Sequence, residues 1–397
     1  MSMRLAEFVS PNSKVRIKKV LFLLKRIIHK RKKIITKYQY KEFYSVGVDT
    51  FFGYYDISPF NGNNDLIYLK LSNEKDTIKI VKNNVENNNE VIIAESHAWN
   101  WQQGCRLRWL TDSIISFNDF NGRSYLNRII NIETSEEIIC PQPLYDIHWE
   151  KKLGVTLDFE LLGKLRPGYG YTCKGDSVVS DSFNSPAIVL INIENGKELD
   201  CITYKDISNS FHTVAPLNSF YINHLSFSPE GNRFLFFWIE IVDGYHKASL
   251  AVYDIEKRII IPLEDEGKAS HYVWINNNNI LCTVYSTPVD CRYYIYNVDK
   301  RGRTEYCPTS LTQDGHPSIY DKTHILTDTY PDANGYQYLR IVDSETDNYN
   351  NLVEIYSVPV NSGEKRTDLH PRFNEDKNMI SFDANVRGRR SLFVIKM

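Results

Sequence analysis

Apolar and polar positions alternate in short runs along most of this chain, and one arrangement of these runs recurs. An apolar or His-Pro entry leads into a strand-like run, a tight polar turn and a second strand-like run. The arrangement reads INHLSFSPEGNRFLFFW at 222–238, ASHYVWINNNNILCTVY at 269–285, DGHPSIYDKTHILTDTY at 314–330 and DLHPRFNEDKNMISFDA at 368–384. Such runs, separated by turn-forming residues, are typical of paired β-strands.

The repeats are evenly spaced. Their histidines His224, His271, His316 and His370 lie 47, 45 and 54 residues apart. A period near 45 residues that is built from short strands is typical of a β-propeller blade. We therefore predict an all-β fold, a seven-bladed β-propeller over residues 38–397, whose equivalent positions converge on a central channel.

The predicted blades differ in regularity. The first begins near FFGYYDISPF (51–60), and the third carries an insertion through RPGYGY (166–171). The fourth to seventh are expected at about 205–257, 258–300, 301–348 and 350–397. The alternating run YQYKEFYSVG at 38–47 is expected to close the ring against the last blade.

Residues 1–37 form a separate basic segment. They hold 12 Lys and Arg residues and one acidic residue, whereas the rest of the chain has a net charge of −13. Within 14–37, apolar residues with helical spacing predict an amphipathic helix: Ile17, Val20, Leu21, Leu24, Ile27 and Ile28. The apolar run is too short to span a bilayer, and no secretory signal is expected.

Three roles for this helix are open. It would lie in the plane of an anionic membrane surface, pack on the propeller with its basic face in water, or bind nucleic acid. We favour the first. Nucleic acid is disfavoured, because nothing downstream resembles a nucleic-acid-binding module. The seven cysteines include no CxxC pair and indicate free thiols in a reducing compartment. Together these features predict a bacterial cytoplasmic protein, peripheral on the inner face of the membrane.

Four segments carry a resemblance to a known family. They are FFGYYDISPF (51–60), AWNWQQG (98–104), LDFELLGKLRPGYGY (157–171) and NHLSFSPEGNRFLFFW (223–238). With the His-Pro blades, they resemble the seven-bladed propeller polysaccharide lyases, in particular the oligogalacturonate lyases and the short ulvan lyases. The similarity covers nearly everything after residue 48, and the basic segment has no counterpart in it.

The resemblance implies β-elimination on a uronate polymer, which needs a group that neutralises the carboxylate, a base and an acid. Arg166 is the candidate neutraliser, because a guanidinium pairs with a carboxylate through two bonds and keeps its charge. His224 matches the family's catalytic histidine and is the candidate base. Tyr169 and Tyr171 are candidates for stacking on a sugar or for acid–base work. The alternative for each residue is a structural role.

A metal set is implied in the same way. Gln313 and His316 resemble the Gln and His ligands of the oligogalacturonate lyases, and His271 matches a third ligand. Where that family has one more histidine, this chain has Ser318. The set suits Mn, Zn, Ca or a similar divalent ion, and its alternative is a set of hydrogen bonds without an ion. Further candidates for lining the substrate channel are Trp99, Gln103, Arg123, His370 and Arg372. His29, His148, His246 and His324 are interpreted as incidental.

Three functions therefore compete. The first is lyase-like action on an acidic, uronate-containing polysaccharide. The second is a membrane-associated cytoplasmic role in surface-polysaccharide biosynthesis, as a glycan-binding partner or a glycosyltransferase that uses the same channel. The third is an interaction propeller without a small-molecule site, because a fold does not fix a function.

Overall fold

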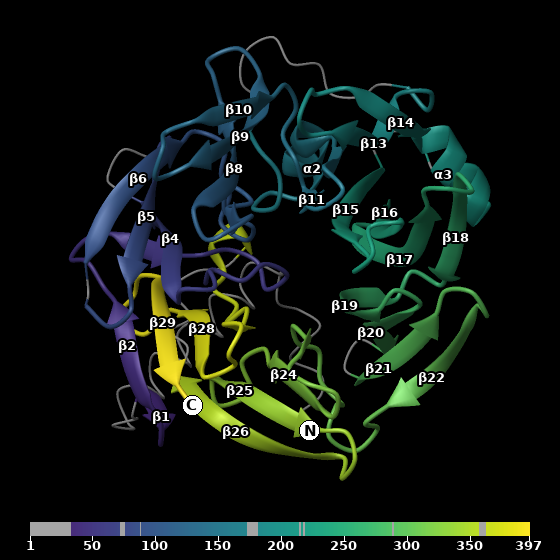
Figure 1. Ribbon diagram of the computed structural model, residues 1–397. Helices are drawn as coiled ribbons and strands as arrows, with labels where there is room; N and C mark the ends of the chain where they lie inside the picture. The colour runs from purple at the N-terminus through teal and green to yellow at the C-terminus, as the bar shows by residue number, and fades with distance from the viewer. Residues whose placement is uncertain are drawn as a thin grey trace, which may run out of the picture.

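Seven antiparallel sheets stand in chain order around a central axis (Figure 1). The computed structural model describes residues 33–397, except 72–75, 88, 173–181, 214–215, 217–218, 288–289 and 357–362. The predicted all-β, seven-bladed propeller is confirmed. None of the helices in this described part is long and apolar enough to cross a membrane.

Each blade contains at least four strands, of which the first named lies nearest the channel. The first blade has β3 (Asp49–Phe51), β4 (Asp65–Leu71), β5 (Ile78–Asn84) and β6 (Glu90–Ser96). The second has β7 (Arg108–Trp109), β8 (Ile114–Phe120), β9 (Tyr125–Asn131) and β10 (Glu137–Cys140). The third has β11 (Asp146–His148), β12 (Leu153–Leu157), β13 (Pro186–Asn192) and β14 (Glu198–Thr203). The fourth has β15 (Phe220–Phe227), β16 (Arg233–Val242), β17 (Tyr245–Asp254) and β18 (Ile259–Glu264).

The remaining blades follow the same plan. The fifth has β19 (Ala269–Asn276), β20 (Asn279–Thr287), β21 (Asp290–Asn297) and β22 (Gly302–Tyr306). The sixth has β23 (Ser318–Ile319), β24 (His324–Asp328), β25 (Tyr336–Asp343) and β26 (Asn348–Tyr356). The seventh has β27 (Arg372–Phe373), β28 (Met379–Ala384), β29 (Ser391–Lys396) and β2 (Gln39–Phe43). Helices α2 (Phe159–Leu165) and α3 (Tyr204–Phe211) and the 3₁₀ turn η1 (Gly363–Lys365) lie in connections.

The ring closes through β2, as predicted. This strand pairs with β29 from Gln39 opposite Lys396 to Phe43 opposite Leu392, and Figure 1 shows purple β2 beside yellow β29. Phe43 is 5% exposed and belongs to the same hydrophobic cluster as Leu392. A strand from the amino-terminal part of the chain is thus held by the last strand.

The amino-terminal boundary differs from the prediction. The expected helix over 14–37 falls mostly outside the described residues. Its last part is strand β1 (Ile34–Thr36), which pairs with β26 and gives the sixth blade a fifth strand. Blade structure therefore begins before residue 38.

The expected blade limits also shift by one strand. We predicted that the fourth blade would end near residue 257, but β18 pairs with β17 and is its outer strand. The sequence of β18, IIIPLE, is an apolar run without alternation, and only two of its six residues are buried. Backbone pairing, which the sequence does not display, assigns this strand to its blade.

Three blades share an unusual backbone feature in or just before the inner strand. His224, His370 and Arg106 have φ angles of 60°, 46° and 54°. At His224 the register between β15 and β16 shifts, as in a β-bulge. Left-handed backbone at residues other than glycine is uncommon and energetically costly, and it clusters at functional sites. Two of these residues, His224 and His370, are candidates for the predicted site.

Replacing Phe43 by Ala tests the closure. We expect the substitution to lower the free energy of unfolding by about 3–4 kcal/mol, because a large buried side chain is lost from the closing strand. Tyr40→Ala is the matched control, since Tyr40 lies on the same strand but is 51% exposed; its effect should stay within about 1 kcal/mol. Denaturant unfolding of both variants measures the difference. Equal effects would contradict the role given to β2.

Candidate active site and metal centre

Arg166 is positioned by the insertion of the third blade. Asp158 caps α2 by accepting hydrogen bonds from the backbone N–H groups of Glu160 and Leu161, and Arg166 follows the last turn as its C-cap. The returning loop packs tightly on this helix, because a Cβ atom on Gly163 would clash with the carbonyl oxygen of Tyr171. The glycine-rich sequence thus allows a close approach that fixes the direction of the loop.

A cavity of about 670 Å³ opens beside this insertion. Four residues predicted for the site line it, namely Arg166, Tyr169, His224 and His271. Its other polar and aromatic lining residues include Tyr54, Tyr221, His246, Lys268, Asp314, Tyr330 and Arg366. The volume lies within the roughly 300–1,000 Å³ of typical small-molecule sites. Side chains from blades that are distant in sequence therefore meet in one cavity, as the repeat predicted.

Tyr169 connects the two principal candidates. Its ring centroid lies 6.2 Å from that of His224, in a perpendicular arrangement, and 5.5 Å from the central carbon of the Arg166 guanidinium. Among the described residues, Arg166 has no carboxylate within ion-pair distance. The cavity thus contains a cation that an anionic ligand can pair with.

His224 is held in its neutral form. Its Nδ1 lies 3.3 Å from the Tyr145 hydroxyl, and its Nε2 lies 3.2 Å from the side-chain nitrogen of Asn223 and 3.5 Å from the Tyr54 hydroxyl. Burial lowers the pKa of His224 well below its usual value, and the neighbouring positive charges, including Arg166, lower it further. The imidazole is therefore unprotonated near neutral pH, which is the state that a base requires.

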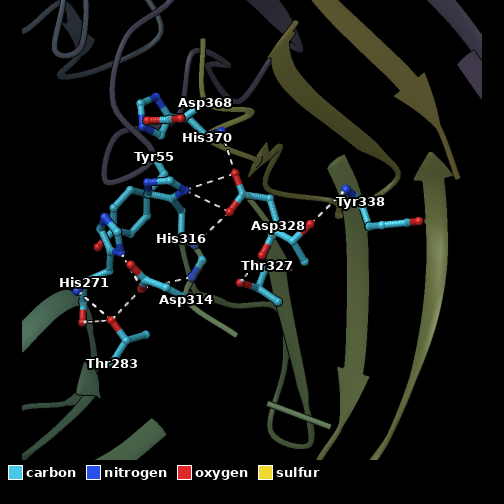
Figure 2. A network of polar contacts seen from close by, with 12 residues as sticks. Tyr55, His271, Thr283, Asp314, His316, Thr327, Asp328, Tyr338, Asp368 and His370 are labelled. Carbon is cyan, nitrogen blue, oxygen red and sulfur yellow. Dashed lines mark hydrogen bonds and ion pairs between the residues drawn. The ribbon is translucent and has the colours of Figure 1, made fainter. Parts of the chain in front are cut away.

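Figure 2 shows a network of polar contacts around His271, a residue of β19. Its Nδ1 lies 2.9 Å from Asp314, whose carboxylate also accepts hydrogen bonds from the hydroxyls of Ser270, Thr283 and Tyr285. Burial raises the pKa of Asp314, but His271 and these donors outweigh it and hold the pKa well below its usual range. Asp314 is thus a charged carboxylate whose hydrogen-bonding capacity is used within the protein.

His316 and His370 lie next to this group, with ring centroids 4.4 Å apart. Nδ1 of His316 lies 2.8 Å from an Asp328 oxygen, and Nδ1 of His370 lies 2.8 Å from the carbonyl oxygen of Gly53. Nδ1 of His370 therefore donates its proton, which leaves its Nε2 with a lone pair. Burial lowers the pKa of His316, but the Asp328 carboxylate outweighs it and raises the pKa above its usual value. Nε2 of His370 is buried and has no hydrogen-bond partner among the described residues.

These imidazoles form a candidate metal centre with Asp368. One ligand atom from each of His316, Asp368 and His370 lies within 4.8 Å of the other two, and all three residues are buried. Two imidazole nitrogens and a carboxylate oxygen suit Mn²⁺, Zn²⁺ and similar ions. The Asp328 contact behind His316 is the kind of outer hydrogen bond that orients metal-binding histidines. The residues present thus fit a divalent ion, and the partnerless nitrogen of His370 is the clearest sign of it.

This set differs from the one expected from the sequence. His316 is common to both sets. Gln313 is exposed, and its neighbour Asp314 is the residue that points inward. The ring centroid of His271 lies 4.2 Å from that of His316, but His271 is not among the three residues whose ligand atoms all lie within 4.8 Å of one another. The chain bends at Gln313, before the inner strand β23, so strand periodicity does not set the direction of this side chain.

Three other candidates make structural contacts instead of lining the main cavity. Tyr171 is 1% exposed, stacks on Phe159 with ring centroids 4.6 Å apart and accepts a hydrogen bond from Asn118. Gln103 is buried and donates to the Tyr145 hydroxyl over 2.7 Å. Arg372 is buried, donates to the Tyr54 carbonyl and pairs with Asp383.

The remaining substrate-binding candidates lie further out. Trp99 lines a smaller cavity of about 240 Å³ on the other side of the insertion, with Trp101, Tyr125 and Tyr171. Arg123 is exposed in the turn between β8 and β9 and lines neither cavity. The aromatic residues around Trp99 offer a surface on which a sugar ring can stack. Arg123 lines no cavity in which it could contact a bound sugar.

Sequence reasoning missed several residues of the site. His246 was interpreted as incidental, yet it lines the cavity and lies 2.9 Å from the Tyr221 hydroxyl. It comes from β17 and not from a repeat histidine position. Asp314 and Asp368 do have a signal, because each stands two residues before a His-Pro pair in the pattern D-x-H-P.

Comparison with known proteins shows that this chain resembles several of them in fold. No protein-family model and no curated protein sequence matches this chain. An oligogalacturonate lyase solved in complex with manganese superposes with a TM-score of 0.64 at 13% identity, over 93% of this chain and 98% of the lyase. The oligogalacturonate lyase of Vibrio parahaemolyticus gives 0.59 at 14% identity, over 91% and 97%. The tricorn protease gives 0.55 at 12% identity, over 87% of this chain and 34% of the protease.

The resemblance that the sequence indicated is thus confirmed at the level of the fold. Lyases and a protease share this propeller, so the structural similarity establishes the fold of this chain and not its activity. The function depends on the residues of the site.

Replacing His370 tests the candidate metal centre. His370→Ala should weaken Mn²⁺ binding by roughly 100-fold or more, because a ligand is removed and outer partners alone contribute about 10–100-fold. His324→Ala is the matched control, since His324 also pairs with an aspartate, Asp321, but at the surface. Titration calorimetry with Mn²⁺ gives both affinities. Loss of binding in Gln313→Ala but not in His370→Ala would favour the sequence-derived set.

The pH dependence of stability tests the neutral state of His224. The unfolded chain protonates this histidine below about pH 6.5, while the folded protein does not, so the unfolded state binds more protons there. Stability should therefore fall as the pH drops from about 6.5 towards 5. His224→Gln should reduce that slope by up to about 1.4 kcal/mol per pH unit. Denaturant unfolding at several pH values measures it, and identical slopes would show that His224 is protonated in the folded protein.

Proposed function

We propose that this protein is a lyase-like propeller that acts on an acidic, uronate-containing oligosaccharide or polysaccharide. One observation supports this most strongly: Arg166, without a carboxylate partner among the described residues, shares a cavity with a neutral His224 and with Tyr169. The fold that the chain shares with two oligogalacturonate lyases supports it further.

In this proposal Arg166 binds the uronate carboxylate. A guanidinium donates two parallel hydrogen bonds to a carboxylate and remains charged at all relevant pH values. Its positive charge draws electron density from the carboxylate and makes the hydrogen on the adjacent ring carbon more acidic. Arg166 therefore both orients the sugar and lowers the barrier to proton removal.

His224 and Tyr169 then share the proton transfers. The neutral imidazole of His224 takes the hydrogen next to the carboxylate as a proton. The electron pair of that C–H bond forms a C=C bond, and the bond to the leaving glycosidic oxygen breaks. The hydroxyl of Tyr169 gives its proton to that oxygen. The positive charges that lower the pKa of His224 are offset when an anionic sugar enters, which strengthens this base in the complex.

The candidate metal centre adds to this arrangement. His316, Asp368 and His370 would hold a divalent ion, which supplies a fixed positive charge that stabilises negative charge near it. His271 stays oriented by Asp314 whether or not an ion is bound, because this pair is complete within the protein. The protein's own residues thus define a cavity that favours anions.

A lyase assay tests the proposal directly. Elimination creates an unsaturated sugar that absorbs in the near ultraviolet, so a panel of uronate polymers with Mn²⁺ should give rising absorbance for at least one. Arg166→Gln should lower kcat/KM by about 100-fold or more, as expected for loss of a charge-stabilising donor. Arg123→Gln is the matched control, because this arginine is exposed and lies outside both cavities; we expect a change within about twofold. Absence of the unsaturated product with every polymer would contradict the proposed reaction.

A further inference from the structure

The insertion of the third blade separates two cavities. Arg166 and Tyr169 line the main cavity, whereas Pro167, Gly168 and Gly170 line the smaller cavity of about 240 Å³. In the described part of the chain, no lining residue is common to the two cavities. The smaller cavity is therefore a separate space on the other side of the same loop, and a ligand there makes its own contacts.

The two cavities differ in the charges that line them. The main cavity has three cationic side chains, those of Arg166, Lys268 and Arg366, against one carboxylate. The smaller cavity has the carboxylates of Asp76 and Glu364, and no Lys or Arg among its described lining residues. Neither carboxylate makes an ion pair or a side-chain hydrogen bond with another described residue. The smaller cavity thus offers hydrogen-bond acceptors and repels anions.

Trp99 supplies an aromatic surface in the smaller cavity. Its half-buried ring lies edge-on to Trp101, with ring centroids 5.4 Å apart at 78°, and its centroid is 6.4 Å from that of Phe51. Its indole N–H has no hydrogen-bond partner among the described residues. An indole has a flat apolar face and a polar edge, which suit the apolar face and the hydroxyls of a sugar ring.

Trp101 supports Trp99 from behind. The ring of Trp101 stacks on Phe51 with centroids 5.8 Å apart at an interplanar angle of 24°. Nζ of Lys365 lies 5.3 Å from the centroid of Trp101, and the guanidinium of Arg390 donates to its backbone carbonyl. Lys365 is not one of the residues that line the cavity. Trp101 is therefore fixed by its neighbours and in turn fixes the edge-on position of Trp99.

Glu364 is fixed against the insertion that forms another wall. Nε2 of the buried Gln102 donates to the carbonyl of Glu364 over 2.9 Å, and its backbone N–H donates to the carbonyl of Gly168 over 3.0 Å. A Cβ atom on Gly168, whose φ is 97°, would lie 2.9 Å from Cβ of Glu364. Glycine at this position allows the close approach. The backbone of Glu364 is thus held beside the cavity that Trp99 lines.

We propose that the smaller cavity is a second carbohydrate-binding site, which takes one neutral sugar unit. Trp99 stacks on the sugar ring, and Asp76 and Glu364 accept hydrogen bonds from its hydroxyls. A uronate in this position would bring its carboxylate close to two others, which is unfavourable. The volume is below the roughly 300–1,000 Å³ of sites for larger ligands, as expected for a single ring. This site goes beyond the proposed function, because it requires neither Arg166 nor the candidate metal centre.

The indole N–H signal of Trp99 in an NMR spectrum reports this site. The main cavity has no tryptophan among its described lining residues. The probes are the methyl glycosides of glucose, galactose, mannose and xylose, and those of glucuronate and galacturonate, titrated into the full chain with isotope-labelled tryptophans. At least one neutral glycoside should shift the Trp99 signal in a saturable way. The uronate of the same configuration should bind there roughly tenfold more weakly, because of the two carboxylates.

Two substitutions test the contacts, with affinities taken from the NMR signals of the sugar itself. Trp99→Leu keeps an apolar side chain but removes the flat ring, and should weaken the neutral sugar by roughly tenfold or more. Trp149→Leu is the matched control, since Trp149 is also half-buried but lines neither cavity; its effect should stay within about twofold. If Trp99→Leu does not fold, Glu364→Gln at an exposed residue carries the test. It should narrow the preference for glucose over glucuronate by roughly threefold, because one of two like charges is lost.

The outcomes distinguish this inference from the proposed function. Failure of every neutral glycoside to shift the Trp99 signal overturns the second site and leaves the role of Arg166 standing. Equal affinity for a neutral sugar and its uronate overturns it too, as does loss of the neutral sugar in Arg166→Gln, which would place that sugar in the main cavity. Neutral-sugar binding at Trp99 by a protein that cleaves no uronate polymer supports the second site and contradicts the proposed reaction.

Discussion

Closure of the ring is the constraint on which the rest of the structure depends. A blade is a small sheet whose two faces must be covered by neighbours, and in a ring each blade covers the next. The pairing of β2 with β29 joins the two ends of the propeller. The first blade is then held against the seventh, where Arg372 donates to the Tyr54 carbonyl and Asp383 accepts from the backbone N–H of Phe52. In this position the ring of Tyr54 lies next to those of both His224 and His370.

Equivalent aspartates extend this constraint around the channel. Asp328 ends β24 and accepts from the backbone N–H groups of His316, in its own blade, and of His370, in the next. Asp383, near the end of β28, does the same for the first blade. Each aspartate thus sets the position of the following blade's entry. The two imidazoles of the candidate metal centre are aligned by the same carboxylate that joins their blades.

The site therefore combines buried, hydrogen-bonded residues at its base with an open cavity. Its floor consists of buried groups that bind one another, such as His271 with Asp314 and His316 with Asp328. Its walls carry cations with donors that remain available, because Arg166 and Arg366 project from connections and not from inner strands. Such preorganised positive charge in a partly enclosed cavity favours an anionic ligand, since binding requires little reorganisation.

The sequence predicts the repeat and therefore the fold, but it predicts the site only in part. The period of the His-bearing phrases predicts a propeller, the count of strand-like segments along the chain gives seven blades, and the convergence of His224, His271, His316 and His370 follows from this arrangement. Side-chain direction does not follow. Gln313 and Asp368 are both two or three residues from a repeat histidine, yet only Asp368 points to the channel. Tyr171 belongs to a glycine-rich loop and was predicted to stack on a sugar or to act in acid–base chemistry, but the close approach allowed by Gly163 buries it. Arg366 lies between blades, where no repeat marks a position, so contacts such as that from Gln102 are visible only in three dimensions.

A crystal structure of the protein soaked with Mn²⁺ and a homouronate dimer tests the central claim most directly. Anomalous scattering locates the ion, and the dimer's density shows its carboxylates. We expect the ion among His316, Asp368 and His370, with a carboxylate of the dimer against Arg166. An ion bound elsewhere, together with a sugar that does not contact Arg166, would contradict the claim.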